Sequence, residues 1–176
     1  IAPAFGIGSE IAATGPNGPS IFPSTALAGR FHTAFDNDAF VRAAILNANG
    51  TVDPGFDPGL NEYVYSSAVL PDGRVLFGGS LTTAFGAARS RIVRLNANLT
   101  LDTAFNPAVN STVRVMMEQP DGKLVIGGNF TAIGATARNR LARLNPDGTV
   151  DAGFNPNVDG PVYSANFLSD GKIIAG

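Results

Sequence analysis

The sequence predicts an all-β fold built from β-propeller blades, each with four antiparallel strands, and three observations lead to this prediction. A phrase returns at a fixed interval, because PDGRVLFGG at residues 71–79 and PDGKLVIGG at residues 120–128 start about 49 residues apart. Short runs rich in Val, Ile, Leu and Phe alternate with turns rich in Gly, Pro, Asn and Asp, as is typical of strands. No stretch of useful length has the periodicity of a helix.

The repeat divides the chain into about three and a half units of about 49 residues, at residues 6–58, 59–107, 108–156 and, in part, 157–176. The second and third units align from end to end, with an expected one-residue slip near Gly86 and Gly134. The first unit is looser, because GPNGPSIFPST at residues 15–25 replaces the PDGK turn. Propellers usually have four to eight blades, so we expect a segment of a longer array. The alternatives are that two chains share one ring or that part of the protein is absent from this sequence.

Tight turns separate the four strands expected in each unit, which in the third unit are VRVMMEQ, KLVIGG, RLARLN and TVDAGF. An Asp-Gly pair lies between the first two strands, where glycine readily takes the positive φ of a hairpin turn. These pairs are Asp72–Gly73 and Asp121–Gly122. The second unit lacks a glycine between its third and fourth strands, and Asn98 is expected to take the left-handed conformation there.

Glycine pairs end the second strand of two units, at Gly78–Gly79 and Gly127–Gly128. Glycine in a strand often marks a close approach of another backbone, so we expect these pairs to let neighbouring blades pack closely. A lone blade cannot bury both of its faces, and stacking of neighbours is therefore part of the prediction. A β-solenoid is the alternative fold, with shorter coils and parallel strands that lack a tight hairpin turn at every corner.

Arginines recur in the pattern R-x-R-x-x-R in the second and third units. They are able to form a basic stripe for an acidic polysaccharide or phosphate, or bidentate ion pairs with aspartates inside the scaffold. Recurrence once per blade favours the scaffold. The arginines are Arg89, Arg91, Arg94, Arg138, Arg140 and Arg143, and the expected partners are Asp102, Asp151, Asp72 and Asp121.

A phenylalanine recurs just before Asp-Pro or Asn-Pro, at Phe56, Phe105 and Phe154, with Phe5 as the counterpart in the preceding unit. Aromatic rings are able to bind sugars, but a fixed place in each blade favours a core position between blades. The absence of Trp and the presence of only three Tyr also argue against a lectin.

Function is best sought where the repeat fails, above all at residues 15–38. The candidate binding residues there are Arg30, His32, Asp36 and Asp38. His32 is the only histidine in the chain, and no G-x-S-x-G motif accompanies it, so we assign no catalytic residue. A carbohydrate-active propeller enzyme, the alternative function, would depend on this irregular unit.

Composition argues against several other classes of function. The chain has no cysteine, which removes disulfides and thiolate metal ligands. Asn145, Asp147 and Asp151 offer oxygen atoms that suit calcium, but a hydrogen-bonded turn explains them more simply, so we expect no metal and no cofactor, with calcium as the alternative. A net charge of -2 argues against nucleic-acid binding, and no apolar run is long enough for a membrane span.

The motifs PDGK-x-x-x-GG-x-F-T at residues 120–131 and R-N-R-x-A-R-L-N-x-D-G-x-x-D-x-x-F-N-P at residues 138–156 resemble the delta-60 repeat, a bacterial β-propeller repeat family. The second unit matches nearly as well, whereas the first departs from the pattern. The resemblance implies a large modular protein that is extracellular or on the bacterial cell surface, of the kind described as an adhesin. We therefore expect a non-catalytic structural or adhesive module whose partners are other protein chains, further propeller blades or surface glycan. A repeat that completes a ring or filament with other chains is a further alternative.

Overall fold

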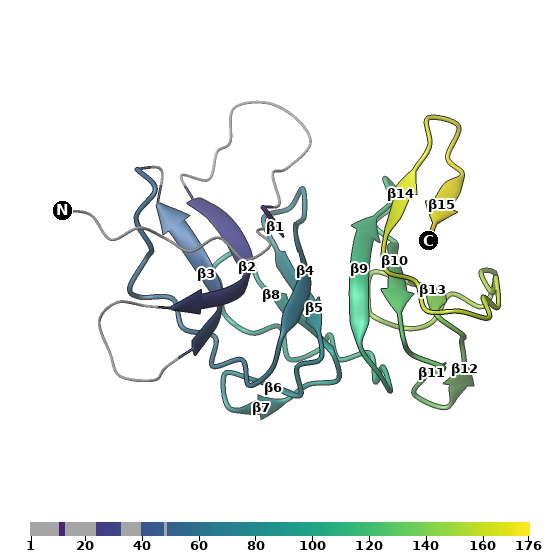
Figure 1. The fold of residues 1–176 in the computed structure, drawn as a ribbon, viewed down its shortest axis with the longest axis horizontal. Helices are drawn as coiled ribbons and strands as arrows, with labels where there is room; N and C mark the ends of the chain where they lie inside the picture. The colour runs from purple at the N-terminus through teal and green to yellow at the C-terminus, as the bar shows by residue number, and fades with distance from the viewer. Residues whose placement is uncertain (1–10, 13–23, 33–39, 48) are drawn as a thin grey trace.

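All regular structure in the described part of the chain is β-strand. The computed structural model describes residues 11–12, 24–32, 40–47 and 49–176. The sheets follow one another in chain order, as Figure 1 shows. The N-terminal sheet consists of β1 (Ile11–Ala12), β2 (Ser24–His32) and β3 (Phe40–Asn47). Every strand pair is antiparallel, which confirms the blade-like arrangement and excludes the solenoid alternative for the described residues.

The second and third sheets follow one plan at an offset of about 49 residues. The second sheet contains β4 (Val64–Val69), β5 (Val75–Gly79) and β8 (Ile92–Leu95). The third contains β9 (Val113–Glu118), β10 (Leu124–Gly128) and β13 (Leu141–Leu144). In both, the middle strand pairs with the other two. The hairpin of β14 (Ala165–Phe167) and β15 (Ile173–Ala175) begins a fourth blade.

The fourth strand of each unit is shorter than predicted. After the third strand, each unit forms only one bridging residue pair. The bridges are Leu46 to Val52, Leu95 to Leu101 and Leu144 to Val150. The chain turns away directly afterwards, where the Asp102 carboxylate accepts hydrogen bonds from the Ala104 and Phe105 amides. An aspartate that bonds to the backbone two residues on is a turn former, so it ends the pairing.

A small extra hairpin follows the glycine pair in both regular blades and was not predicted. Its strands are β6 (Thr83–Ala84) and β7 (Ala87–Ala88) in one blade, and β11 (Ala132–Ile133) and β12 (Thr136–Ala137) in the next. The expected one-residue slip is wrong, because these strands keep the regular offset. Phe85 adopts a φ of 50° at the place where Gly134 has 57°.

An asparagine before each first strand anchors this hairpin. The Asn61 side chain accepts hydrogen bonds from the amides of Thr82 at 2.9 Å and Thr83 at 3.0 Å. Asn110 makes the same pair of bonds in the next unit, at 3.0 and 3.1 Å, and donates to the Thr131 hydroxyl at 2.9 Å. One side chain therefore fixes the loop at the same end of both blades.

The core lies between the sheets. Alternate side chains of a strand point to opposite faces, so Val75 and Phe77 pack with residues of the first sheet while Leu76 packs with those of the third. Phe105 is 1% exposed within the cluster shared by the second and third blades. Phe56 lies in the preceding cluster, as expected of an inter-blade core residue, whereas Phe154 is only half-buried and packs against the following cluster. Phe5 lies outside the described residues.

The hairpin turns have the predicted backbone, with one exception. Gly73 and Gly122 have φ values of 85° and 78°. In the turn without glycine, Leu99 takes the left-handed conformation with a φ of 65°, so the assignment to Asn98 is wrong. The Asn98 side chain instead accepts hydrogen bonds from the Thr100 amide and hydroxyl, which holds the turn in shape. None of the described residues forms a helix that would be long and apolar enough to cross a membrane.

Candidate functional site

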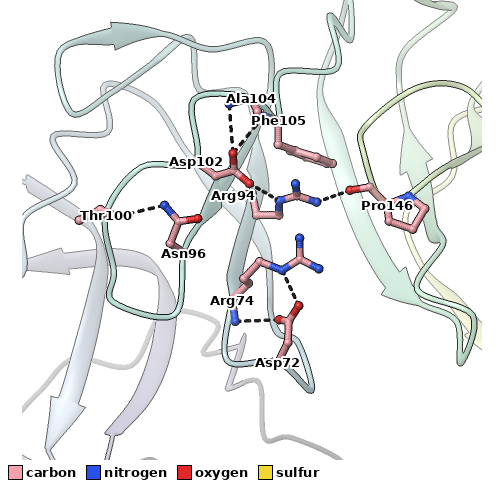
Figure 2. Close-up of polar contacts among 9 residues, drawn as sticks. All are labelled: Asp72, Arg74, Arg94, Asn96, Thr100, Asp102, Ala104, Phe105 and Pro146. Atoms are coloured by element: carbon pink, nitrogen blue, oxygen red, sulfur yellow. Dashed lines mark hydrogen bonds and ion pairs between the residues drawn. The ribbon is translucent and has the colours of Figure 1, made fainter.

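Arg94 joins two blades, as Figure 2 shows. Its Nε donates to Asp102 at 2.8 Å, and its terminal nitrogen donates to the Pro146 carbonyl of the next blade at 2.5 Å. Its guanidinium also lies 3.9 Å from the centroid of the Phe105 ring. Burial raises the pKa of Asp102, but the hydrogen bond and charge of Arg94, with two backbone amides, outweigh it and leave the pKa below its usual value. The ion pair predicted from the sequence is therefore present and has a structural task.

Arg143 repeats this arrangement in the third blade. It donates to Asp151 at 2.9 Å and lies 4.8 Å from the Phe154 ring centroid. Its terminal nitrogen reaches Gln119 of its own blade at 3.3 Å, where Arg94 reaches the neighbouring blade. Lys123 also donates to Asp151, at 3.0 Å. This bond, with the Gly153 amide and Arg143, lowers the pKa of Asp151 to about 2.

The other arginines of the repeat are bound to the scaffold by backbone carbonyls. Arg91 and Arg140 have positive φ values of 72° and 63° and donate to the carbonyls of residues 80 and 129. Arg89 and Arg138 are buried and donate to the carbonyl of the preceding residue. These contacts oppose the basic-stripe interpretation.

The turn aspartates have other partners than the arginines expected for them. Asp72 pairs with Arg74 at 2.6 Å, and Asp121 lies 4.0 Å from Lys123. Each pair is separated by only two positions, so the turn itself brings the charges together. The expected pairing of Asp72 and Asp121 with the R-x-R-x-x-R arginines is wrong.

The candidate binding residues of the first unit are not brought together by any described contact. Arg30 and His32 lie in β2, whereas Asp36 and Asp38 lie outside the described residues. A binding role for these four residues stays a prediction. Among the residues that the structure describes, no three His, Asp or Glu side chains gather as metal ligands would. The carboxylate of Asp147, in the turn considered for calcium, accepts hydrogen bonds from the Thr149 amide and hydroxyl.

A group of tyrosines and arginines, which the sequence analysis did not connect, forms a continuous stack. The Arg42 guanidinium lies 5.1 Å from the Tyr63 ring centroid, and the Tyr63 ring stacks on Tyr65 at 6.2 Å and 28°. The Arg114 guanidinium lies between two rings, 5.1 Å from Tyr65 and 4.7 Å from Tyr163. All three tyrosines of the chain take part. We call these five residues the Tyr–Arg ladder.

The ladder follows the strand that begins each blade. Tyr65 on β4, Arg114 on β9 and Tyr163 before β14 occupy one repeat position, about 49 residues apart. The strands β4, β9 and β14 are neighbours in space. The side chains at this position therefore contact one another across three successive blades, although the residue type changes from blade to blade.

A β-bulge presents these side chains. In β4, Val64 pairs with Gly79 and Ser66 with Gly78, which leaves Tyr65 as the extra residue. Arg114 is the extra residue of β9 in the same way. The amides of Tyr163 and Ser164 both donate to the Gly176 carbonyl, at 2.7 and 2.9 Å. Bulges redirect a side chain and are common beside functional sites.

The glycine pair makes the bulge possible. A Cβ at Gly79 or Gly128 would overlap the carbonyl oxygen of residue 63 or 112, which directly precedes the neighbouring first strand. The first glycine of each pair has the role predicted from the sequence, since a Cβ at Gly78 would lie 2.8 Å from Met116 of the next blade. One glycine thus serves blade packing, and the other serves the bulge.

Arg114 is held in place with free donors. Its Nε donates to the Asn129 side chain at 2.8 Å, whereas its terminal nitrogens have no hydrogen-bond partner among the described residues. The Tyr163 ring beside it is 59% exposed, Tyr65 is half-buried, and Tyr63, which stacks on Tyr65, is 39% exposed. The signal in the sequence was the change from Tyr65 to Arg114 to Tyr163 at one repeat position, which a search for identical residues passes over.

Two hollows elsewhere on the described part of the chain are poorer candidates for a functional site than the ladder. A cavity of about 10 Å³ between the second and third blades, lined in part by Arg74, Arg94 and Glu118, has room for one water molecule at most. Burial, with the charge of Asp72, raises the pKa of Glu118 there. An open hollow of about 420 Å³ lies beside Arg143 and Phe154, at the face of the third blade. Neither places an acid and a base around a space of substrate size.

Comparison with known families agrees with the architecture. Residues 70–105 and 119–154 match a family model described as "Domain of unknown function (DUF5122) beta-propeller". The chain contains β-propeller repeats. The two matched stretches fall in the second and third units, whose sheets share one plan. No curated protein matches the chain.

Proposed function

We propose that this chain is a non-catalytic structural or adhesive module of a secreted or cell-surface bacterial protein. The Tyr–Arg ladder makes its contacts with protein or glycan partners. The ladder is the observation that carries the proposal, because it gathers exposed rings and an arginine with free donors on three successive blades. Exposed Tyr and Arg are enriched in the energetically dominant part of binding surfaces.

The location is supported by the resemblance of the two regular units to delta-60 repeats, which occur in secreted and surface-attached bacterial proteins. The absence of a catalytic role is supported by the carboxylates of the repeat motifs. Asp102 and Asp151 are bound to arginine, and Asp72 and Asp121 serve turns. A general acid or base needs a free carboxyl group within reach of a substrate.

The proposal is tested by measuring binding of the purified chain to arrays of bacterial surface glycans and to bacterial surface proteins. We expect binding that is lost when Tyr63 and Tyr163 are both replaced by alanine. A matched control replaces Phe85, an exposed aromatic residue of the small hairpin that is not a member of the ladder. Turnover of a glycan, abolished by a single side-chain change, would instead establish the enzyme alternative.

A further inference from the structure

We infer that the Tyr–Arg ladder binds a carboxylate-bearing glycan, with Arg114 as the carboxylate site; this inference rests on the proposed function and names its ligand class. The guanidinium of Arg114 is planar and lies between the rings of Tyr65 and Tyr163. The two ring centroids lie 5.1 and 4.7 Å from the guanidinium carbon, and the bond to Asn129 occupies Nε. The terminal nitrogens, which form the fork that matches a carboxylate, are left at its edge.

The charge of Arg114 favours an anion. Its Nε donates to the neutral side chain of Asn129, and no carboxylate among the described residues pairs with it. On one side of Arg114, the ring of Tyr63 extends the aromatic surface beyond Tyr65. On the other side lies the ring of Tyr163, which is more exposed. Rings with a polar hydroxyl at the edge offer both apolar contact and hydrogen bonds, which suits a sugar that carries an acid group.

A glycan fits this surface better than an acidic peptide. An extended peptide commonly gains affinity by adding a strand to an exposed sheet edge. The edges available here, β4 and β9, are each interrupted by the bulge that carries Tyr65 or Arg114. A bulge at an edge opposes such pairing. The ladder therefore offers side chains and no continuous backbone edge, which favours a ligand recognised through side chains alone.

The test uses the whole chain and calorimetric titration with oligosaccharides of galacturonate, glucuronate and mannuronate, beside their uncharged methyl esters. We expect binding of at least one acid, with its ester about tenfold or more weaker, because one charged hydrogen-bonded contact is lost. Arg114→Gln should weaken binding of the acid by the same factor. Lys172→Gln, which removes an equal charge from a side chain that is 77% exposed, should leave binding unchanged.

The outcomes separate this inference from the broader proposal. Equal binding of acid and ester overturns the carboxylate assignment but keeps a glycan-binding module. Binding of poly-glutamate without binding of any oligosaccharide overturns the glycan in favour of a protein partner. Binding to none of these probes overturns the inference, whereas the proposed module falls only if the surface-protein assays are also negative. The comparison of acid with ester uses the unaltered chain, so it holds even if Arg114→Gln fails to fold.

Discussion

Replacement of Arg94 by methionine should destabilise the protein much more than the same change at Arg143. The two arginines occupy one repeat position and each pairs with an aspartate, so the chain contains its own control. They differ in their surroundings. The Arg94 and Asp102 side chains are 9% and 14% exposed, and Arg94 alone reaches a carbonyl of the next blade.

The magnitude follows from these contacts. Removing one partner of a buried ion pair costs about 3–5 kcal/mol, because the other charge stays buried. Two backbone amides still bond to Asp102, so we expect about 3 kcal/mol for Arg94→Met. Arg143 is more exposed, at 23%, and its loss leaves Lys123 beside Asp151. We expect about 1 kcal/mol for Arg143→Met, which is the scale of exposed pairs.

Urea unfolding followed by circular dichroism measures both changes in the free energy of unfolding. The expected difference is about 2 kcal/mol, and the m-value should stay constant if the blades unfold together. Equal losses for the two variants would refute the argument that the contact with Pro146 and the burial of the pair stabilise the blade interface.

Three further changes test other parts of the fold. Gly128→Ala should cost about 3 kcal/mol, because its Cβ would overlap a backbone carbonyl, whereas Gly160→Ala, which meets nothing within 4 Å, should be nearly neutral in the same unfolding assay. Asn110→Ala should cost about 2 kcal/mol through the loss of its bonds to the small hairpin, and hydrogen exchange should speed up there and not in β10. The pKa of Asp151 in the folded protein is about 2, below its ordinary value of 3.8. The stability that this difference gives above pH 3.8 should therefore be lost as the pH falls from 3.8 towards 2. Asp151→Asn should flatten this part of the pH profile measured by thermal unfolding, and an unchanged slope would contradict the assignment.

The sequence predicted the features that local chemistry determines. The Asp-Gly turns at Gly73 and Gly122, the inter-blade place of Phe105 and the pairing of Arg94 with Asp102 all appear in the structure. Each depends on residue types that recur unchanged. The left-handed residue of the turn without glycine was wrongly predicted to be Asn98. Leu99 takes that conformation instead, because its packing against the core offsets the poor preference of leucine for a positive φ.

The Tyr–Arg ladder escaped prediction for a physical reason. Its members touch across three blades, and the contact depends on how β4 and β9 are placed relative to one another. The bulge that redirects Tyr65 and Arg114 depends on Gly79 and Gly128, whose glycine identity was explained by packing alone. The three tyrosines were too few to suggest a sugar surface by composition, yet the fold gathers all of them in one place.

The bulge has a consequence for how such a chain diversifies. The residue at the bulge is released from strand pairing, while the glycine beside it is fixed by the backbone that it faces. Substitution at this single place in a blade leaves the hydrogen-bonded scaffold intact, as the exchange of Tyr65 for Arg114 between two otherwise similar units illustrates. Each blade thus contributes one variable residue to a surface whose hydrogen-bonded scaffold stays constant. Under the proposed function, the residue types at this position along successive blades determine which partner the ladder binds.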